Sequence, residues 1–386
     1  MKNEPRLLLM RRSVFSQLFV LCALLAGIAC GPGVWTSAAA AGGRASSGRA
    51  GSAGCAIHQS GPKCRRRPLH TVAHLSRPFR FFSPHSFWNT AVPAGARVDP
   101  TSRALISDLM RYVRREQAGR YGPWINASSN GVAIVTVPAD QPDVAVRLNH
   151  APDPTLSAAW SAVPLPASAR PSPGDNDLAV WQPSTDTMWE FFQLHRDASG
   201  WEAEWGGAMR NVTSNPGVYG PGAWPTSSAN DDESWWGVTA ASFPIVGGAM
   251  TYDDLRAGHI DHALALVYPN VRRRTFVSPA QRDDGWSTDP NSLPEGTRLR
   301  LDPSLNLAKL KMPPLTRMIA QAAQRYGIII RDQSPVIAFI QQDPTGNPRF
   351  LALGPKLTGG RYPSQLLASF PWRHLQVMGM DVHLGW

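Results

Sequence analysis

The chain has 386 residues, which is long enough for one large β-rich domain or for two domains. Its 33 Gly and 35 Pro indicate many turns but stay below the level of a disordered low-complexity chain. The formal charge of +10 is concentrated at the start, because residues 1–80 hold twelve Lys and Arg against a single acid. The rest of the chain is therefore close to neutral, which is not the charge pattern of a nucleic-acid-binding domain, and we expect no nucleic-acid partner.

The N-terminus has the order of a secretory signal. Arg11 and Arg12 precede the apolar residues 14–28, and a run of small residues follows at 37–41. The apolar run is short and ends at a Gly-Pro-Gly triplet, which predicts a signal peptide over residues 1–41 and no integral membrane segment after its removal. The paired arginines also fit the twin-arginine pattern, so both export routes stay open. We expect a secreted protein, extracellular or associated with the cell envelope.

Residues 42–77 predict a flexible basic linker, because they are rich in Gly, Ser, Ala and Arg and have little hydrophobic periodicity. This segment holds Cys55 and Cys64, the two cysteines left after signal removal. Export favours one disulfide-closed loop between them, whereas a zinc site would need more ligands at close spacing. We therefore expect no metal and no cofactor. A single β-rich domain is predicted over residues 78–386.

The predicted elements begin with a helix that starts at Pro100-Thr101-Ser102 and ends by Gly119. Short runs between turn residues then predict five strands, at 131–137, 144–148, 178–182, 188–195 and 201–205. The clearest hairpin joins 178–182 to the strand beginning at Met188, and we expect 201–205 to complete a meander with it.

Residues 211–240 lack periodicity and predict a long loop of the kind that covers a site. The chain beyond it predicts two helices, at 252–255 and 313–327, and four strands, at 262–268, 298–301, 328–331 and 336–341. Together these elements predict a mainly β fold, a jelly-roll-like β-sandwich with two or three peripheral helices.

The sequence lacks the short motifs of several large enzyme classes. It contains no G-x-S-x-G, no H-E-x-x-H, no phosphate loop, no G-x-G-x-x-G at a strand-to-helix turn and no CxxC pair. Acids and aromatic side chains on a β-scaffold remain, the combination expected where a protein surface meets sugar. Carboxylates supply acid, base or nucleophile, and indole faces stack on pyranose rings.

Three residues are candidates for catalysis. Glu190 lies between Trp189 and Phe191, where burial would raise its pKa and suit a general acid, although it could also face outward on an amphipathic strand. Asp177 could be the partner carboxylate or a turn cap, and His262 a base, an orienting group or a buried structural histidine.

Four residues are candidates for substrate binding. Trp235 and Trp236, in the predicted long loop, could serve as sugar platforms. A polysaccharide lyase would need a positive charge beside the uronate and a proton acceptor, for which Arg210 and Tyr219 are candidates. The pair Glu202 and Glu204 is a weaker candidate for catalysis, and Asp332, which ends a strand at a tight turn, is expected to cap that turn and is also a weaker candidate for function.

These observations predict a secreted carbohydrate-active protein, a glycoside hydrolase or polysaccharide lyase that uses acidic residues on polysaccharide or cell-envelope glycan. A non-catalytic β-sandwich that binds glycan or cell envelope is the alternative. A structural envelope protein whose Arg-rich linker contacts anionic polymers is a third hypothesis.

The chain resembles a functionally uncharacterised family of secreted soil-bacterial, especially actinobacterial, proteins. The resemblance rests on an S-x-W-N-T motif beginning at Ser86, a G-x-I-x-H-A-L motif beginning at Gly258, and a Y-G-x4-D motif that runs from Tyr326 to Asp332. It spans about residues 79–378 and implies an exported β-sandwich. It implies no established catalytic residue.

Overall fold

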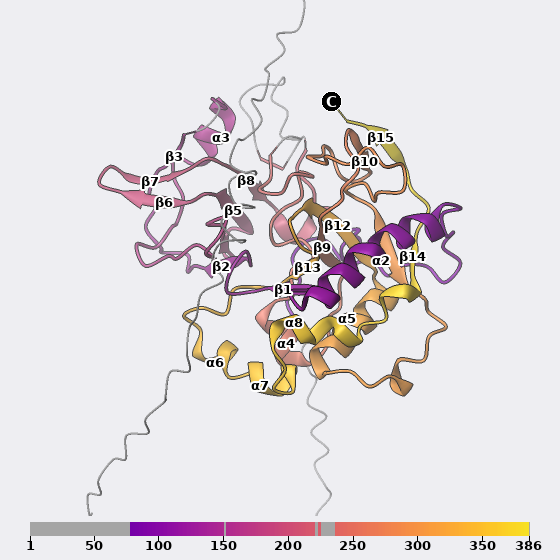
Figure 1. Cartoon of the computed structure of the whole chain (residues 1–386). Coiled ribbons are helices and arrows are strands. Elements are labelled where there is room, and N and C mark those ends of the chain that lie inside the picture. Colours follow the sequence, from indigo (N-terminus) through magenta and orange to yellow (C-terminus); the bar gives the residue numbers. More distant parts are fainter. Residues whose placement is uncertain (1–77, 150–151, 221–222, 225–235, 386) are drawn as a thin grey trace, which may run out of the picture. The chain divides into compact units, whose positions relative to one another are not determined.

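The computed structural model describes residues 78–149, 152–220, 223–224 and 236–385 (Figure 1). These residues belong to the second of two units into which the chain divides, Ala73–Trp386. The predicted signal peptide, the predicted linker with Cys55 and Cys64, and Trp235 lie outside the described residues. Across the described ranges, no helix has the length and apolar character needed to cross a membrane.

The largest sheet is six-stranded and mixed, with its strands in the order β1-β13-β9-β12-β11-β14. Two of its neighbouring pairs are parallel, β1 with β13 and β9 with β12, and the others are antiparallel. Its strands are β1 (Trp124–Asn126), β9 (Leu264–Tyr268), β11 (Arg298–Leu301), β12 (Ile328–Gln333), β13 (Ala338–Ile340) and β14 (Leu375–Val377).

The strands β9, β12 and β13 are buried on both faces, and alternate residues of each enter different cores. In β9, Leu264 and Leu266 join one core, and Ala265 and Val267 join the other. The first core also contains the apolar faces of the helices α2 (Ser102–Gly119) and α5 (Pro314–Arg325). The apolar character of β9 and β12 therefore follows from burial on two sides.

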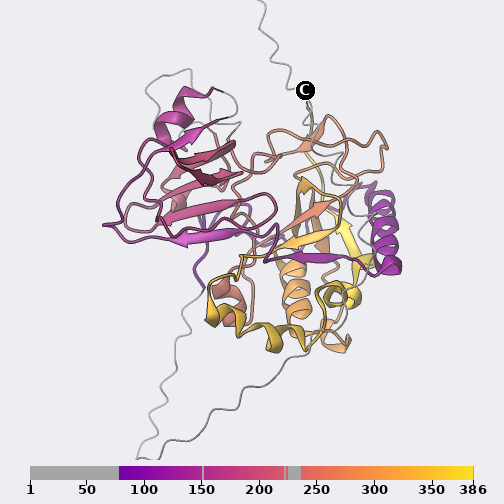
Figure 2. The same ribbon diagram turned by 60° about the vertical axis from the view of Figure 1, so that its left-hand side comes forward.

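The second core is shared with the smaller sheets. One is four-stranded, in the order β2-β4-β5-β8, and one is three-stranded, in the order β3-β7-β6 (Figure 2). Their strands are β2 (Ala133–Thr136), β3 (Val146–Leu148), β4 (Leu178–Gln182), β5 (Thr187–Phe192), β6 (His195–Asp197), β7 (Gly200–Ala203) and β8 (Trp205–Arg210). A further two-stranded sheet pairs β10 (Thr275–Val277) with β15 (Val382–Leu384).

The two long helices end at residues with start or stop signals in the sequence. Helix α5 begins with a proline at its first turn and is followed by Gly327, and α2 ends at Arg120 in the left-handed conformation. Helix α2 packs against β14, and α5 packs against β9 and β11. The short helices are α3 (Pro154–Ala159), α4 (Tyr252–Ala257), α6 (Pro348–Leu351), α7 (Gly354–Thr358) and α8 (Pro363–Leu366), with 3-10 turns at Val212–Ser214, Leu307–Lys309, Leu367–Ser369 and Trp372–His374.

The prediction of a mainly β fold is confirmed, but the jelly roll is not. Among the described residues there are four separate sheets, and three of them contain both parallel and antiparallel strand pairs. The α-helices of the described residues, α2 to α8, outnumber the two or three that we expected. The helices α2, α4 and α5 correspond to predicted ones, and the additional helices are the short α3, α6, α7 and α8.

The predicted meander is wrong in its third strand. The hairpin of β4 and β5 is present, but the strand that pairs with β5 is β8, and β7 pairs with β3 and β6. Gly206 and Gly207, early in β8, give this segment a sequence that is untypical of a strand. Glycine is required at both positions, because a Cβ at Gly206 would lie 2.0 Å from the Glu190 carbonyl oxygen, and one at Gly207 would lie 2.5 Å from the Tyr219 ring.

Candidate functional site

Near the carboxyl end of β12, apolar residues are followed by charged ones. Ile328, Ile329 and Ile330 are buried, and Arg331 and Asp332 follow directly. The register of β12 with its parallel partner β9 shifts between Ile330 and Asp332, which marks a β-bulge. Bulges re-aim side chains, and the carboxyl ends of parallel strands are common places for ligand sites.

Arg331 is a buried cation held by the fold. Its side chain is 5% exposed, and its Nη1 donates a hydrogen bond to the Ile245 carbonyl oxygen at 2.8 Å. Burial lowers the pKa of Arg331, while the carboxylates of Asp332 and Asp177 oppose that change. Arg331 is therefore a fixed positive charge among acidic side chains.

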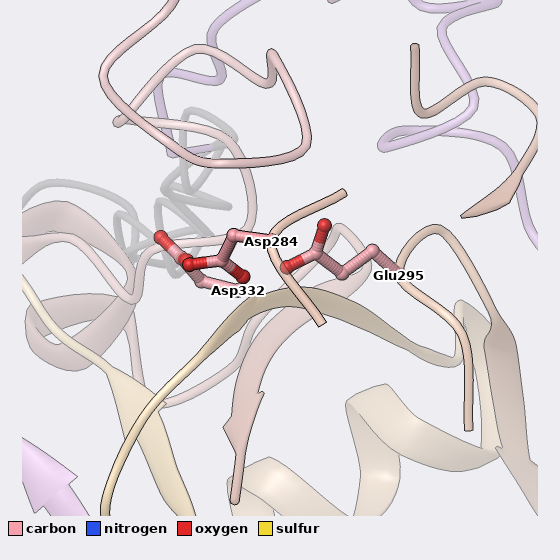
Figure 3. A group of neighbouring side chains, drawn as sticks. All are labelled: Asp284, Glu295 and Asp332. Carbon is pink, nitrogen blue, oxygen red and sulfur yellow. The ribbon is translucent and has the colours of Figure 1, made fainter. Parts of the chain in front are cut away.

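Three carboxylates meet beside this strand end: Asp284, Glu295 and Asp332, which we call the carboxylate site (Figure 3). One oxygen of each lies within 4.8 Å of one oxygen of each of the others. Asp284 is exposed, Asp332 is half-buried and Glu295 is completely buried. In Figure 3 the Glu295 carboxylate points toward Asp284, which lies between it and Asp332.

Backbone hydrogen bonds fix the position of Glu295. Val277 N donates to the Glu295 carbonyl oxygen at 2.8 Å, and the next residue, Gly296, donates from its N to the Ile330 carbonyl oxygen at 2.8 Å. Gly296 has a φ of +80°, and a Cβ there would lie 1.8 Å from the Val277 carbonyl oxygen. The chain thus brings Glu295 close to β12 through a contact that only glycine permits.

The carboxylate site has more negative charge than its surroundings balance. Although the Asp284 residue is exposed, the pKa of its carboxyl group is raised, like those of Glu295 and Asp332, because protein atoms replace water around the group. The charge of Asp284 is the next largest cause for the other two. Neither oxygen of Glu295 has a hydrogen-bond partner among the described residues. Arg331 and Arg282 oppose part of this charge, and Arg282 donates from Nη2 to the carbonyl oxygens of Gly237 and Thr239. The site therefore favours added positive charge.

The three carboxylates are also suited to a divalent cation. Carboxylate oxygens are the hard ligands that Ca²⁺ and Mg²⁺ prefer. Their mutual distances allow all three residues to contribute one oxygen each to a single ion. These residues are therefore the ones that could hold a metal.

An exposed tryptophan lies at the same edge of the sheet. Trp286 is 62% exposed, and its Nε1 donates to the Pro269 carbonyl oxygen at 2.7 Å. Pro269 follows Tyr268, whose register partner in β12 is Gln333, the residue after Asp332. An indole and a solvent-accessible carboxylate, Asp284, thus come from one short segment.

The structure places Glu190 in the protein interior. It is 0% exposed, and its two carboxylate oxygens accept hydrogen bonds from Val238 N and Ile245 N, each at 2.8 Å. Burial raises its pKa to about 7, although these two N–H donors lower it. The prediction that burial raises this pKa is confirmed, but the geometry shows a carboxylate that anchors the segment 238–245.

Asp177 lies in the same buried charged region. It is 8% exposed, and its Oδ1 has no hydrogen-bond partner among the described residues. Burial raises its pKa, and the charges of Asp175, Asp332 and Glu190 raise it further, while Arg331 lowers it. Asp177 and Glu190 thus both lie within electrostatic range of Arg331.

His262 belongs to a different place in the fold. It is 7% exposed, its Nε2 lies 3.2 Å from Asp254 Oδ2, and its Nδ1 lies 2.8 Å from the Ala263 carbonyl oxygen. Burial lowers its pKa, but Asp254 more than offsets this and the net pKa is raised. Asp254 also caps α4 through Thr251, so His262 joins the capping of a helix.

The three predicted substrate-binding residues that the structure describes, Trp236, Tyr219 and Arg210, do not form one open surface. Trp236 is 1% exposed and donates from Nε1 to Asp153 Oδ2 at 3.0 Å, so the expectation that it is a sugar platform is wrong. Tyr219 is buried, and burial raises its pKa well above the usual value, which makes it unsuited as a base. Arg210 is exposed, with its guanidinium 4.7 Å from the Trp224 ring.

Asp284 and Glu295 were missed by the sequence analysis, and Asp332 was expected to cap a turn. Asp332 carries a local signal, since it ends an apolar strand. Asp284 and Glu295 lie in residues 278–297, which contain no helix or strand, so nothing local indicates what they contact. Glu202, the weaker candidate, forms surface ion pairs with Arg147 and His195.

Comparisons with models of protein families, with curated proteins and with solved structures find no match to this chain. The geometry of the site therefore carries the functional argument alone.

Proposed function

We propose that the protein is a secreted carbohydrate-active enzyme, a glycoside hydrolase or polysaccharide lyase, that acts on polysaccharide at the carboxylate site. The observation that carries the proposal is the meeting of Asp284, Glu295 and Asp332, with the exposed indole of Trp286 two residues from Asp284 in the sequence. The signal peptide predicted from the sequence favours a substrate outside the cell.

Cleavage of a glycosidic bond requires carboxylates at the reacting centre. In hydrolysis they act as acid, base or nucleophile, at a separation of roughly 5 Å in enzymes that retain configuration. In elimination, positive charge must neutralise the uronate, and carboxylates can hold a cation that does so. The closest oxygens of Asp284 and Asp332 lie within 4.8 Å, and Asp284 is exposed, so a substrate can reach this pair.

Trp286 supports a carbohydrate substrate. Its indole is exposed, and the hydrogen bond from Nε1 to Pro269 fixes the ring position. A fixed aromatic face stacks on the C–H face of a pyranose with little loss of conformational entropy. The same feature supports the second candidate function, a module that binds glycan without cleaving it.

The test is to incubate the purified protein with plant, fungal and bacterial polysaccharides, including uronates and arabinans. Products are followed as new reducing ends and as the ultraviolet absorbance of unsaturated uronates. Reducing ends without absorbance indicate hydrolysis, and both together indicate elimination. Retention on one polymer without products would replace the enzyme proposal by the binding module.

The site assignment is tested with Asp284→Asn and Asp332→Asn. Each is expected to lower kcat by about a hundredfold or more, because either a reacting carboxylate or a ligand to a cation at the reacting centre is lost. Asp253→Asn is the matched control, since Asp253 is a carboxylate on the surface of α4 that pairs with Arg256. Unchanged turnover in both site variants would move the reaction elsewhere on the molecule.

A further inference from the structure

We infer that Asp284, Glu295 and Asp332 bind a divalent cation, and that this cation is Ca²⁺. The inference deepens the proposed function and rests on it for its role in the reaction, whereas cation binding itself can be measured without a substrate. It begins from the imbalance of charge at the carboxylate site.

Glu295 is the residue that points to a ligand. It is 0% exposed, so water cannot solvate its charge, and neither oxygen has a hydrogen-bond donor among the described residues. A buried charge is normally paired, hydrogen-bonded or bound to a metal. In Figure 3 this side chain points into the cluster. Glu295 is thus a buried side chain directed at two other carboxylates, and a hydrogen bond between it and Asp284 requires a proton on one of the two.

The nearby arginines do not fill this need. The Nη2 of Arg282 donates to the carbonyl oxygens of Gly237 and Thr239, and the Nη1 of Arg331 donates to the Ile245 carbonyl oxygen. No ion pair joins either arginine to Asp284, Glu295 or Asp332 among the described residues. Asp175 and Asp177 also act on Arg331, so its positive charge is shared among several acidic side chains.

The donor set favours Ca²⁺ among common cations. All three ligand groups are carboxylates, and the described residues of the cluster offer no thiolate or imidazole that would select zinc or copper. Ca²⁺ takes six to eight oxygens at about 2.3 to 2.6 Å and tolerates irregular geometry, whereas Mg²⁺ needs an octahedron and keeps several waters. Asp284 is exposed, which leaves the cation accessible to an oxygen of the substrate.

A bound cation gives the proposed function a substrate class. With Asp284 and Asp332 engaged as ligands, the accessible positive charge would be the cation, which attracts the carboxylate of a uronate. The inference therefore assigns an acidic, uronate-containing polysaccharide as the ligand of this site.

The test uses terbium luminescence on the full-length protein. Tb³⁺ prefers oxygen ligands as Ca²⁺ does, and energy transfer from excited tryptophan side chains sensitises its emission. Sensitised emission should rise with Tb³⁺ and be displaced by Ca²⁺ more readily than by Mg²⁺. Glu295→Gln and Asp332→Asn should each lower the affinity for Ca²⁺ at least about tenfold, as expected for loss of a coordinating charge. Glu116→Gln should leave the Ca²⁺ affinity unchanged, since Glu116 is a buried carboxylate outside the site.

A second readout covers variants that lose the luminescence by unfolding. Addition of Ca²⁺ should raise the Tm of the wild-type protein and of Glu116→Gln, and should leave that of Glu295→Gln unchanged. Equal Tb³⁺ binding by wild type and both site variants, or a Ca²⁺ response that survives Glu295→Gln, would overturn the inference. Cation binding without turnover on any polysaccharide would leave the inference standing and reject the enzyme proposal.

Discussion

Glu190 and Glu295 are both 0% exposed, but the carboxylates of these two regions have opposite surroundings. In the four-stranded sheet, the oxygens of Glu190 receive one backbone N–H each, from Val238 and Ile245. Beside β12, the oxygens of Glu295 receive none from the described residues and face Asp284. A buried carboxylate whose oxygens are satisfied stabilises a fold, whereas one whose oxygens are not satisfied marks a place where the protein needs a ligand or a proton.

The largest effect is expected from Glu190→Ala. It leaves the N–H groups of Val238 and Ile245 buried without acceptors and opens a cavity, so the free energy of unfolding should fall by about 3 to 5 kcal/mol. Urea denaturation measures it, with Glu204→Ala as an exposed control on the same chain segment. A loss as small as that of the control would mean that Glu190 does not anchor residues 238–245.

A second effect should depend on pH and concerns Glu116, whose pKa burial raises to about 7 from 4.5. The native state then holds a proton that the unfolded chain releases, so this contribution to stability is complete below pH 4.5 and is lost as pH rises through about 7. The difference amounts to about 3 kcal/mol. Glu116→Gln should remove that part of the decline, measured as unfolding free energy across this window. A decline that is unchanged in the variant would contradict the assignment.

Glu295→Gln should change stability in the direction opposite to Glu190→Ala. In a chelator and at alkaline pH, removing the unpaired charge should raise the unfolding free energy by about 1 to 2 kcal/mol. The measurement is the same urea titration, run beside Glu190→Gln as the matched substitution at a satisfied carboxylate. Destabilisation of both variants would show that Glu295 has partners in solution.

Local sequence signals predicted the strands well where burial follows from a short apolar run. The predicted bounds of β4 and β11 agree with the structure, and α2 ends where Gly119 indicates. The prediction of the meander's third strand was wrong because Gly206 and Gly207 are required by their contacts with Glu190 and Tyr219. A local sequence pattern contains no information about these contacts. Propensity describes a residue's preference, and tertiary contact overrode it at this point.

The site was harder to predict because its chemistry depends on distant segments. The sequence placed Glu190 among aromatic residues and so predicted its burial, but not the N–H groups of Val238 and Ile245 that satisfy it. Asp332 was visible as a strand end, and Asp284 and Glu295 approach it through the irregular residues 278–297. The backbone contacts of Glu295 and Gly296 with Val277 and Ile330 explain why Glu295 lies close to β12.

The smallest effect on stability, and the most specific one on function, is expected from Trp286→Ala. Trp286 is 62% exposed, so truncation should change the unfolding free energy by less than about 0.5 kcal/mol. Affinity for the recognised polysaccharide should fall about tenfold, or ~1.4 kcal/mol, because the stacking face is lost. The contrast is Trp236→Ala, which removes a core indole and should destabilise by about 3 to 5 kcal/mol. Calorimetry with the polysaccharide measures the first effect and urea denaturation the second. If Trp286→Ala binds as tightly as wild type, then Asp284, Glu295 and Asp332 must account for binding without help from this indole.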